Sequence, residues 1–193
     1  MASIRPVIAA LAMVVISLTA CDREPGQGEA SPAPAVAPAP GQPATGTVME
    51  TAARDPDFTT LVSAMQTAGM DAAMKGAGPY TLFAPTNAAF EKAPAARRDF
   101  LTTPEGLPEL RRLLTYHVIP GRLDTAELVQ RIQAGGGSLA LTTMQGGVLT
   151  AQLRADGAIE LTDATGGVSR VVEADMVASN GIIHSVDAVA APG

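Results

Sequence analysis

The chain has 193 residues, of which 47% are hydrophobic and 3% aromatic, and it carries 13 basic and 19 acidic side chains. A net charge of −6 with so few aromatic residues supplies neither the basic surface nor the stacking platform of a nucleic-acid binder, so the composition excludes nucleic acid as a partner. The length suits one domain with extensions, and a single cysteine excludes an internal disulfide.

Residues 1–20 have the pattern of a signal peptide. Arg5 precedes an apolar run, residues 7–18, which at 1.5 Å per residue is too short to cross a ~30 Å bilayer core as a helix. Residues 18–21 (Leu-Thr-Ala-Cys) resemble the bacterial lipobox, in which the chain is cut before the cysteine and the cysteine is acylated. We therefore predict that Cys21 attaches the chain to membrane lipid. The other interpretation is an ordinary signal peptide with a chance cysteine.

The stretch after the cysteine predicts a tether in the cell envelope. Asp22 resembles the residue that retains lipoproteins in the inner membrane of enteric bacteria, so it favours the periplasmic face of the inner membrane over the outer membrane. Residues 21–46 are rich in proline and alanine, a composition that cannot form a core. We expect this segment to be disordered and to hold the globular part above the membrane surface.

A strand-to-helix corner is predicted over residues 80–90. Residues 80–84 are apolar, aromatic or β-branched, as in a buried strand, and Pro85 withholds the amide that a further ladder bond would need. Thr86 is placed to cap a helix, and Phe90 falls one turn later, where it can turn inward. A corner with apolar residues on both arms is typical of a core.

Helices are predicted on both sides of this corner. Asp55-Pro56 has the pattern of an N-cap followed by a first-turn proline, and apolar residues then recur at helical spacing. A short helical piece is expected over residues 95–101. A clearer helix, with leucines along one side, is expected from about Glu105 to Tyr116.

One more helix is predicted after Tyr116. Asp124 and Glu127 have the spacing of a capping box, and apolar residues follow at helical spacing. Three consecutive glycines, residues 135–137, close this helix, and we expect them to form a flexible connection.

From Ser138 onward the apolar pattern changes to period two, which is typical of half-buried strands. Glycine-containing pairs separate the apolar runs and predict hairpin turns: Gly146-Gly147, Asp156-Gly157, Gly166-Gly167 and Asn180-Gly181. A helical first half followed by a strand-rich second half gives an α+β fold.

Three stretches resemble the signature motifs of the fasciclin domain and occur in the family's order. They are residues 81–90 (Thr-Leu-Phe-Ala-Pro-Thr-Asn-Ala-Ala-Phe), 116–121 (Tyr-His-Val-Ile-Pro-Gly) and 179–192, which begin Ser-Asn-Gly-Ile-Ile-His. The resemblance implies one fasciclin-like domain over residues 47–191, a wedge-shaped β-sheet core flanked by several short helices. The matched residues, which we expect to be mainly structural, are Thr81, Phe83, Pro85, Thr86, Asn87, Phe90, Tyr116, His117, Asn180, Gly181, His184 and Asp187.

Two histidines, His117 and His184, would have to serve any imidazole-based acid–base, triad or metal site. Residues 184–187 contain all three residue types of a catalytic triad, but neighbours on a strand alternate faces, so His184 and Ser185 should point apart. No carboxylate stands at ligand spacing from either histidine, and the single cysteine is assigned to lipid. We therefore predict no catalytic residue, no metal and no cofactor, and two buried, hydrogen-bonded histidines.

These observations favour a membrane-anchored, non-catalytic module on the periplasmic side of the cell envelope. The resemblance implies adhesion, with an unidentified envelope protein or polysaccharide as the partner. One alternative is a carrier of small apolar ligands, which requires a cavity between the helices and the sheet. Another alternative is a hydrolase that uses His117 or His184.

Overall fold

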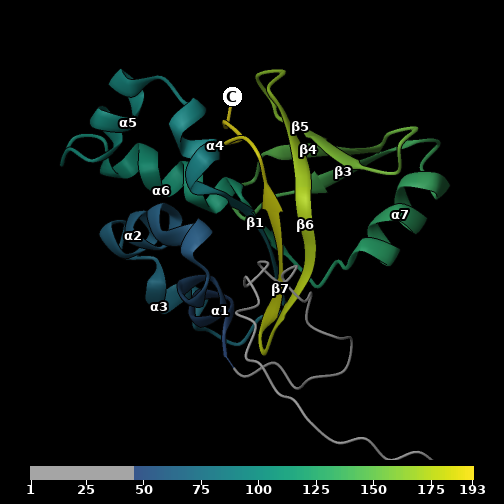
Figure 1. Cartoon of the computed structure of the whole chain (residues 1–193), viewed down its shortest axis with the longest axis horizontal. Helices are drawn as coiled ribbons and strands as arrows, with labels where there is room; N and C mark the ends of the chain where they lie inside the picture. The colour runs from purple at the N-terminus through teal and green to yellow at the C-terminus, as the bar shows by residue number, and fades with distance from the viewer. Residues whose placement is uncertain (1–45) are drawn as a thin grey trace, which may run out of the picture. The chain divides into compact units, whose positions relative to one another are not determined.

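The computed structural model of the protein describes residues 46–193 (Figure 1). The predicted signal peptide, Cys21, Asp22 and the predicted tether up to residue 45 lie outside the described residues. Within the part that is described, no helix combines the length and the apolar character needed to cross a membrane.

Residues 46–193 contain seven α-helices, one 3-10 helix and seven strands. The helices are α1 (Val48–Arg54), η1 (Pro56–Phe58), α2 (Thr59–Thr67), α3 (Asp71–Met74), α4 (Asn87–Lys92), α5 (Ala95–Leu101), α6 (Leu107–Tyr116) and α7 (Thr125–Ala134). The strands are β1 (Tyr80–Pro85), β2 (Val118–Pro120), β3 (Ser138–Thr142), β4 (Val148–Leu153), β5 (Ile159–Thr162), β6 (Val168–Ala178) and β7 (Gly181–Val186). This order confirms the predicted α+β class.

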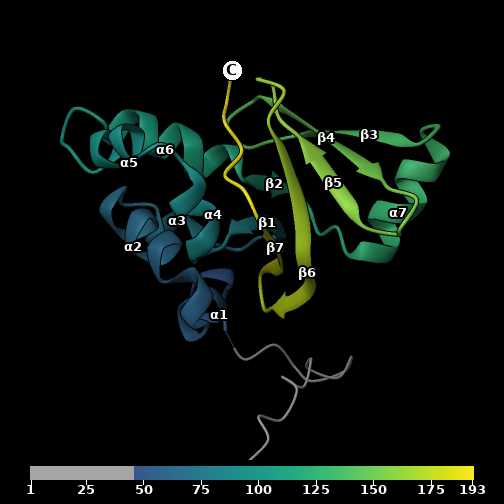
Figure 2. The same cartoon turned by 45° about the horizontal axis from the view of Figure 1, so that its top comes forward.

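All seven strands belong to one sheet, in the order β2-β1-β7-β6-β5-β4-β3. β1 runs parallel to β7, and the other neighbouring strands are antiparallel. Strand β1, which carries the first half of the first motif, therefore joins this sheet and pairs with the last strand of the chain. Figure 2 shows helices α1 to α6 gathered on the side of β1 and β7, whereas α7 lies beside β3 and β4.

Strands β1 and β7 separate two hydrophobic cores. Helices α1 to α6 pack on one side, together with Leu82, Ala84 and Ile183. On the other side, Phe83 and Val186 join α7 and the inner faces of β3, β4 and β5. Successive residues of a strand point to opposite faces, so a strand between two cores is apolar at consecutive positions. This is why β1 has three consecutive apolar residues, Leu82 to Ala84, while β3 to β5 alternate.

Helix α1 is an addition to the sequence-based expectations. It begins with a complete capping box: the Thr47 hydroxyl accepts from the Glu50 amide at 3.3 Å, and the Glu50 carboxylate accepts from the Thr47 amide at 2.8 Å. Val48, Met49 and Ala52 are buried in the core that the helices share. The Thr-x-x-Glu spacing is the local signal that predicts this helix.

The capping box predicted at the start of α7 is half formed. The Asp124 carboxylate accepts from the Glu127 amide at 2.8 Å. The Glu127 carboxylate pairs with Arg131, one turn further along the helix, instead of closing the box. The helix starts where the sequence predicts, with one of the two expected cap bonds.

The glycines that follow α7 form an ordered helix end, which corrects the flexible connection predicted for residues 135–137. The Gly137 amide donates to the Ile132 carbonyl at 2.9 Å, and the Gly136 amide donates to the Gln133 carbonyl at 3.2 Å. Gly136 and Gly137 have left-handed φ angles, +75° and +100°. This bond pattern satisfies carbonyls that the end of a helix leaves unpaired, and it depends on residues that tolerate positive φ.

Candidate functional site

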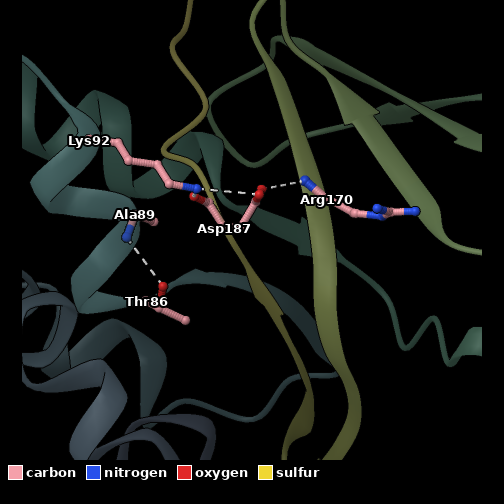
Figure 3. A network of polar contacts seen from close by, with 5 residues as sticks. All are labelled: Thr86, Ala89, Lys92, Arg170 and Asp187. Carbon is pink, nitrogen blue, oxygen red and sulfur yellow. Dashed lines mark hydrogen bonds and ion pairs between the residues drawn. The ribbon is translucent and has the colours of Figure 1, made fainter.

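The corner between β1 and α4 holds three segments of the chain together. The Thr86 hydroxyl accepts from the Ala89 amide at 3.2 Å and caps α4, as predicted (Figure 3). The Asn87 side chain bonds η1 and α2: its oxygen accepts from the Thr60 amide at 2.9 Å, and its nitrogen donates to the Pro56 carbonyl at 2.8 Å. Both polar side chains are thus engaged within the domain.

The other residues of this motif also face the interior. The buried Thr81 hydroxyl donates to the Gly121 carbonyl at 2.8 Å and accepts from the Leu123 amide at 2.9 Å, which fixes the segment that follows β2. Pro85 is the final residue of β1, and Phe90 lies in the helical core with 8% of its surface exposed. The positions and hydrogen bonds of these residues therefore indicate a structural role for this motif.

Asp187 connects the end of β7 to β6 and to α4 (Figure 3). Its carboxylate accepts from the Arg170 amide at 2.8 Å, and the Lys92 ammonium lies 3.4 Å from the other carboxylate oxygen. Lys92 also donates to the Asp187 carbonyl at 2.9 Å. The carboxylate is thus bonded to β6 and α4. A catalytic triad would require it to bond His184. The ring nitrogens of His184 instead bond the backbone of Leu123 and Asp175.

Replacing Thr86 with alanine should lower the free energy of unfolding by about 1 kcal/mol, because the amide of Ala89 loses its cap acceptor. Thr86→Ser keeps the hydroxyl and should behave nearly as the wild type. Urea denaturation of the three proteins checks this. Equal losses for the alanine and serine variants would show that the methyl group, and not the cap bond, matters.

Tyr116 ties helix α6 to the strand-rich half of the domain. Its buried hydroxyl donates to the Val148 carbonyl at 2.6 Å and accepts from the Ala164 amide at 3.1 Å. A Cβ atom added at Gly147 would lie 2.6 Å from the Tyr116 ring, so the β3–β4 turn packs directly on it. Burial raises the pKa of Tyr116, and the hydrogen bond from Ala164 offsets part of the increase.

His117 is buried and both of its ring nitrogens are engaged. Nδ1 lies 2.8 Å from the Leu113 carbonyl, so it carries the proton, and Nε2 accepts from the Ala190 amide at 3.1 Å. Burial lowers the pKa of His117, while the bond to Leu113 and the charge of Asp163 oppose the decrease. A second proton on the ring would place an N–H group against the amide of Ala190. The imidazole is therefore held in one neutral form.

Asp163 is an engaged carboxylate that the sequence patterns do not single out. It accepts bonds from the amides of Ala191, Thr165 and Gly167 at 2.7 to 2.8 Å, and from the Thr165 hydroxyl. Burial raises the pKa of Asp163, but these hydrogen bonds together outweigh it and hold the pKa below its usual value. The carboxylate organises the β5–β6 turn and fixes the C-terminal segment.

His184 repeats the arrangement of His117 on strand β7. Nε2 lies 2.8 Å from the Leu123 carbonyl, and Nδ1 accepts from the Asp175 amide at 3.3 Å. The ring stacks on Phe83, with 5.5 Å between the ring centres. Burial lowers the pKa of His184, and the bond to Leu123 and the Asp175 charge oppose the decrease. The predicted burial and hydrogen bonding of both histidines match the structure.

Asn180 and Gly181 form the junction between β6, β7 and the helices. The Asn180 side chain accepts from the Val48 amide and donates to the carbonyls of Met74 and Gly76, each at 2.8 Å. One side chain thus connects the last hairpin to α1, α3 and the loop before β1. Gly181 follows directly and packs against the backbone of Tyr80.

The chemistry available to these residues is limited by their bonding. Both imidazoles lack a free nitrogen for a substrate or a metal. Among residues 46–193, no group of three or more His, Cys, Asp or Glu is arranged to hold a metal ion. The matched polar side chains thus have their hydrogen-bond partners within the domain.

Two adjoining cavities lie among the helices. The first, of about 240 Å³, is bounded by α4, α5 and the segment after β7. The second, of about 340 Å³, is bounded by α2, α4, α5 and α6. Phe90, Arg98 and Leu101 line both. Sequence patterns could not reveal them, because they depend on how helices distant along the chain pack.

Six residues on the outer side of strands β3 to β6 form a surface that we call the open face. Directly opposed residues in antiparallel strands share a side, which places Ala140, Thr150, Thr162 and Val168 in one row. Thr142 and Val148 form the adjacent row. Val148 and Val168 are 45% and 53% exposed, and the six side chains carry no charge. The intervening residues point inward and form the second core.

Comparison with known proteins places this domain in a family. The family model "Fasciclin domain" matches residues 56–192. The chain is 38% identical over 146 residues to Protein sll1483 of Synechocystis sp., covering 76% of this chain and 73% of that protein. It is 34% identical over 151 residues to the transforming growth factor-beta-induced protein ig-h3 of Sus scrofa, covering 78% of this chain and 20% of that protein.

Two further similarities agree with this. The immunogenic protein MPB70 of Mycobacterium bovis is 39% identical over 104 residues, covering 51% of this chain and 52% of that protein. A solved structure of a FAS1 domain pair from the insect cell adhesion molecule Fasciclin I superposes with a TM-score of 0.68 at 18% identity. The alignment covers 76% of this chain and 51% of the pair, and it shows a shared fold.

Proposed function

Because the chain belongs to the fasciclin domain family, we propose that it is a non-catalytic binding module of the cell envelope. Acylated Cys21 anchors it to membrane lipid on the periplasmic side, with Asp22 favouring the inner membrane. The globular domain engages an envelope protein or a polysaccharide. The observation that carries the non-catalytic part is that both histidines are buried with each ring nitrogen bonded to the backbone.

The same observation argues against the hydrolase alternative. A general base needs a free nitrogen within hydrogen-bond reach of the proton that it removes. In His117 and His184 one nitrogen donates to a carbonyl and the other accepts from an amide, so neither can serve without breaking the scaffold. None of the named relatives carries the name of an enzyme, and a protein that shares the fold is described as a cell adhesion molecule, which supports the proposal of a binding function.

The open face is the surface that suits partner binding best. Its two rows of valine, threonine and alanine side chains are uncharged, and they border Glu160 and Arg170 on the same side of the sheet. An uncharged patch with exposed β-branched side chains loses little when it is dehydrated, and its hydroxyls can still bond a partner. The inner side of the same strands is fixed by the second core, so the face is preorganised.

A photo-crosslinking experiment in cells of the host tests this proposal. A photo-reactive residue at Thr150, in the centre of the open face, should give specific crosslinks. The same residue at Ala72, which is exposed on α3, should not. Protease digestion would convert a protein adduct to peptides and leave a polysaccharide adduct intact. Val168→Asp should reduce crosslinking from Thr150 at least tenfold, whereas Val177→Asp, on the same strand outside the face, should not.

Anchoring is measured in the same cells. Cys21→Ser should release the protein from the membrane fraction, and Asp22→Ser should move it toward the outer membrane if the host sorts lipoproteins as enteric bacteria do.

Crosslinks of equal strength from Thr150 and Ala72 would overturn the open face as the binding site. Turnover of an ester or glycoside substrate by the wild type, lost in His117→Ala or His184→Ala, would overturn the non-catalytic assignment.

A further inference from the structure

The side chain of Arg98, on helix α5, lines both cavities and has a hydrogen-bond donor without a partner. Its Nε atom is buried without a hydrogen-bond partner, and among residues 46–193 its guanidinium forms no ion pair. Buried polar groups in proteins are almost always bonded, so an unpaired donor on a permanent cation requires an explanation. The Nε atom of the neighbouring Arg97 is likewise buried and unpaired, although its terminal nitrogen pairs with Glu109 at 3.1 Å.

The first cavity collects positive charge. Its charged lining residues are Lys92, Arg97 and Arg98, and no carboxylate lines it. Lys92 and Arg97 are paired with Asp187 and Glu109, which leaves Arg98 uncompensated. The remaining lining is apolar. A small anionic group placed here would meet the guanidinium group of Arg98, which has no carboxylate partner, in a partly dehydrated site where charge-assisted bonds are strong.

The second cavity supplies the apolar part of the site. Its floor is formed by Phe90, Leu101 and Leu110, each at most 8% exposed. Hydroxyl residues of α2, Thr102 directly after α5, Glu91 and Asn87 also line this cavity. Glu91 is exposed and lies outside any ion pair with Arg98. The cavity volume of about 340 Å³ is within the range of small-molecule sites.

We infer that the two cavities form one site for an amphiphilic organic anion, a carboxylate with a medium-length alkyl chain. The carboxylate pairs with Arg98 and Arg97 in the first cavity, and the chain lies on Phe90, Leu101 and Leu110 in the second. Both parts are needed. The net charge of −6 disfavours simple anions, and an uncharged apolar molecule would leave the Arg98 guanidinium without an anionic partner.

This site differs from the one expected for an apolar-ligand carrier. The cavity that such a carrier requires lies between the helices and the sheet, whereas these cavities lie mainly among α2, α4, α5 and α6. The site is also independent of the proposed open face. It is formed by helices α2, α4, α5 and α6 and by the segment after β7, and the open face comes from strands β3 to β6. A failure of either proposal therefore leaves the other standing.

Isothermal titration with decanoate below its micelle concentration tests the inference. The full chain carries Cys21→Ser, so that no attached acyl chain competes. Decanoate should bind saturably, and decanol and acetate should each bind at least tenfold more weakly, because each lacks one half of the recognition. Arg98→Gln should weaken decanoate about ten- to a hundredfold, the loss expected for a hydrogen bond to a charged group. The matched control Arg112→Gln, an exposed arginine on α6, should bind as the wild type.

Two measurements separate a ligand site from a structural role. Thermal unfolding of Arg98→Gln should match or exceed the wild type, because the lost guanidinium bonds no other described residue. Ala64→Leu, which fills part of the second cavity, should weaken decanoate without changing acetate. Equal binding of decanol would show a purely apolar cavity, and equal binding of acetate would show a simple anion site. Either result, or absence of saturable decanoate binding, overturns the proposal.

Discussion

Gly181→Ala should lower the free energy of unfolding by at least about 3 kcal/mol, the upper end of the usual range for overpacking. A Cβ atom at this position would lie 2.2 Å from the carbonyl oxygen of Tyr80 and 3.0 Å from the side chain of Val48. The first contact is with backbone, so no side-chain rotation can relieve it. Gly181 and Tyr80 are partners in the parallel pairing of β1 with β7, which means that the strands must separate.

The position of this clash makes its effect large. β1 and β7 lie between the two hydrophobic cores, and the Tyr80 amide donates to the Asn180 carbonyl at 3.0 Å. Moving the strands apart weakens both cores and this bond together. A typical domain has about 5 to 15 kcal/mol of total stability, so a loss of this size removes much of the margin.

Chemical denaturation followed by circular dichroism measures the loss. Gly157→Asn is the control, because Gly157 has a φ of +83° and open space around its Cβ position, and asparagine tolerates this conformation. The control should unfold within about 0.5 kcal/mol of the wild type, as surface substitutions usually do. A Gly181→Ala protein as stable as the control would mean that β1 and β7 are not packed as closely as described.

The strands and turns were the most predictable part of this fold, because their signals are local. Thr86 directly follows its strand and caps the next helix, and Gly146, Gly157 and Gly166 mark three of the hairpin turns by their positive φ. Strand β6 is less apparent. Its pairing with β7 is interrupted by register shifts, and Asp175 has a φ of +62°, so the period-two pattern breaks within the strand.

The site could be predicted only in part. The family motifs located both histidines and Asn180, but the partners of Asn180 lie more than 100 residues away in sequence, at Val48, Met74 and Gly76. Single-sequence patterns contain no record of such contacts. Arg98 is one arginine among several in the helical half, and the missing partner of its Nε atom becomes visible when α2, α4 and α6 are placed around it.

Lowering the pH from 7.5 to 5.5 should reduce the free energy of unfolding through the two histidines, by at most roughly 3 kcal/mol. In the unfolded chain each imidazole takes up a proton around pH 6.5, the ordinary pKa of histidine. In the folded domain burial lowers both pKa values, and a second ring proton on His117 or His184 would face a backbone amide. The unfolded state therefore binds more protons than the folded state below pH 6.5.

The sign of the effect follows from that difference. A lowered folded pKa gives stability that is fully present above the unfolded pKa and is lost as the pH falls toward the folded pKa. Each histidine contributes a limiting slope of about 1.4 kcal/mol per pH unit. The hydrogen-bonded carboxylate of Asp163 also has a lowered pKa, but its stability is lost near and below its unfolded pKa of 3.8. The two sets of groups therefore act in separate pH ranges.

Urea denaturation at several pH values between 5 and 8, for the wild type and both single variants, measures these contributions. At pH 7.5, His117→Ala and His184→Ala should each cost about 1 to 3 kcal/mol, since a buried backbone partner is left unpaired. Each variant should also lose about half of the wild-type pH dependence, because one proton-binding difference is removed. A wild-type stability that stays constant from pH 7.5 to 5.5 would mean that the folded domain takes up these protons as readily as the unfolded chain. The imidazoles would then be accessible to acid–base chemistry, and the case for a non-catalytic scaffold would fail at its central observation.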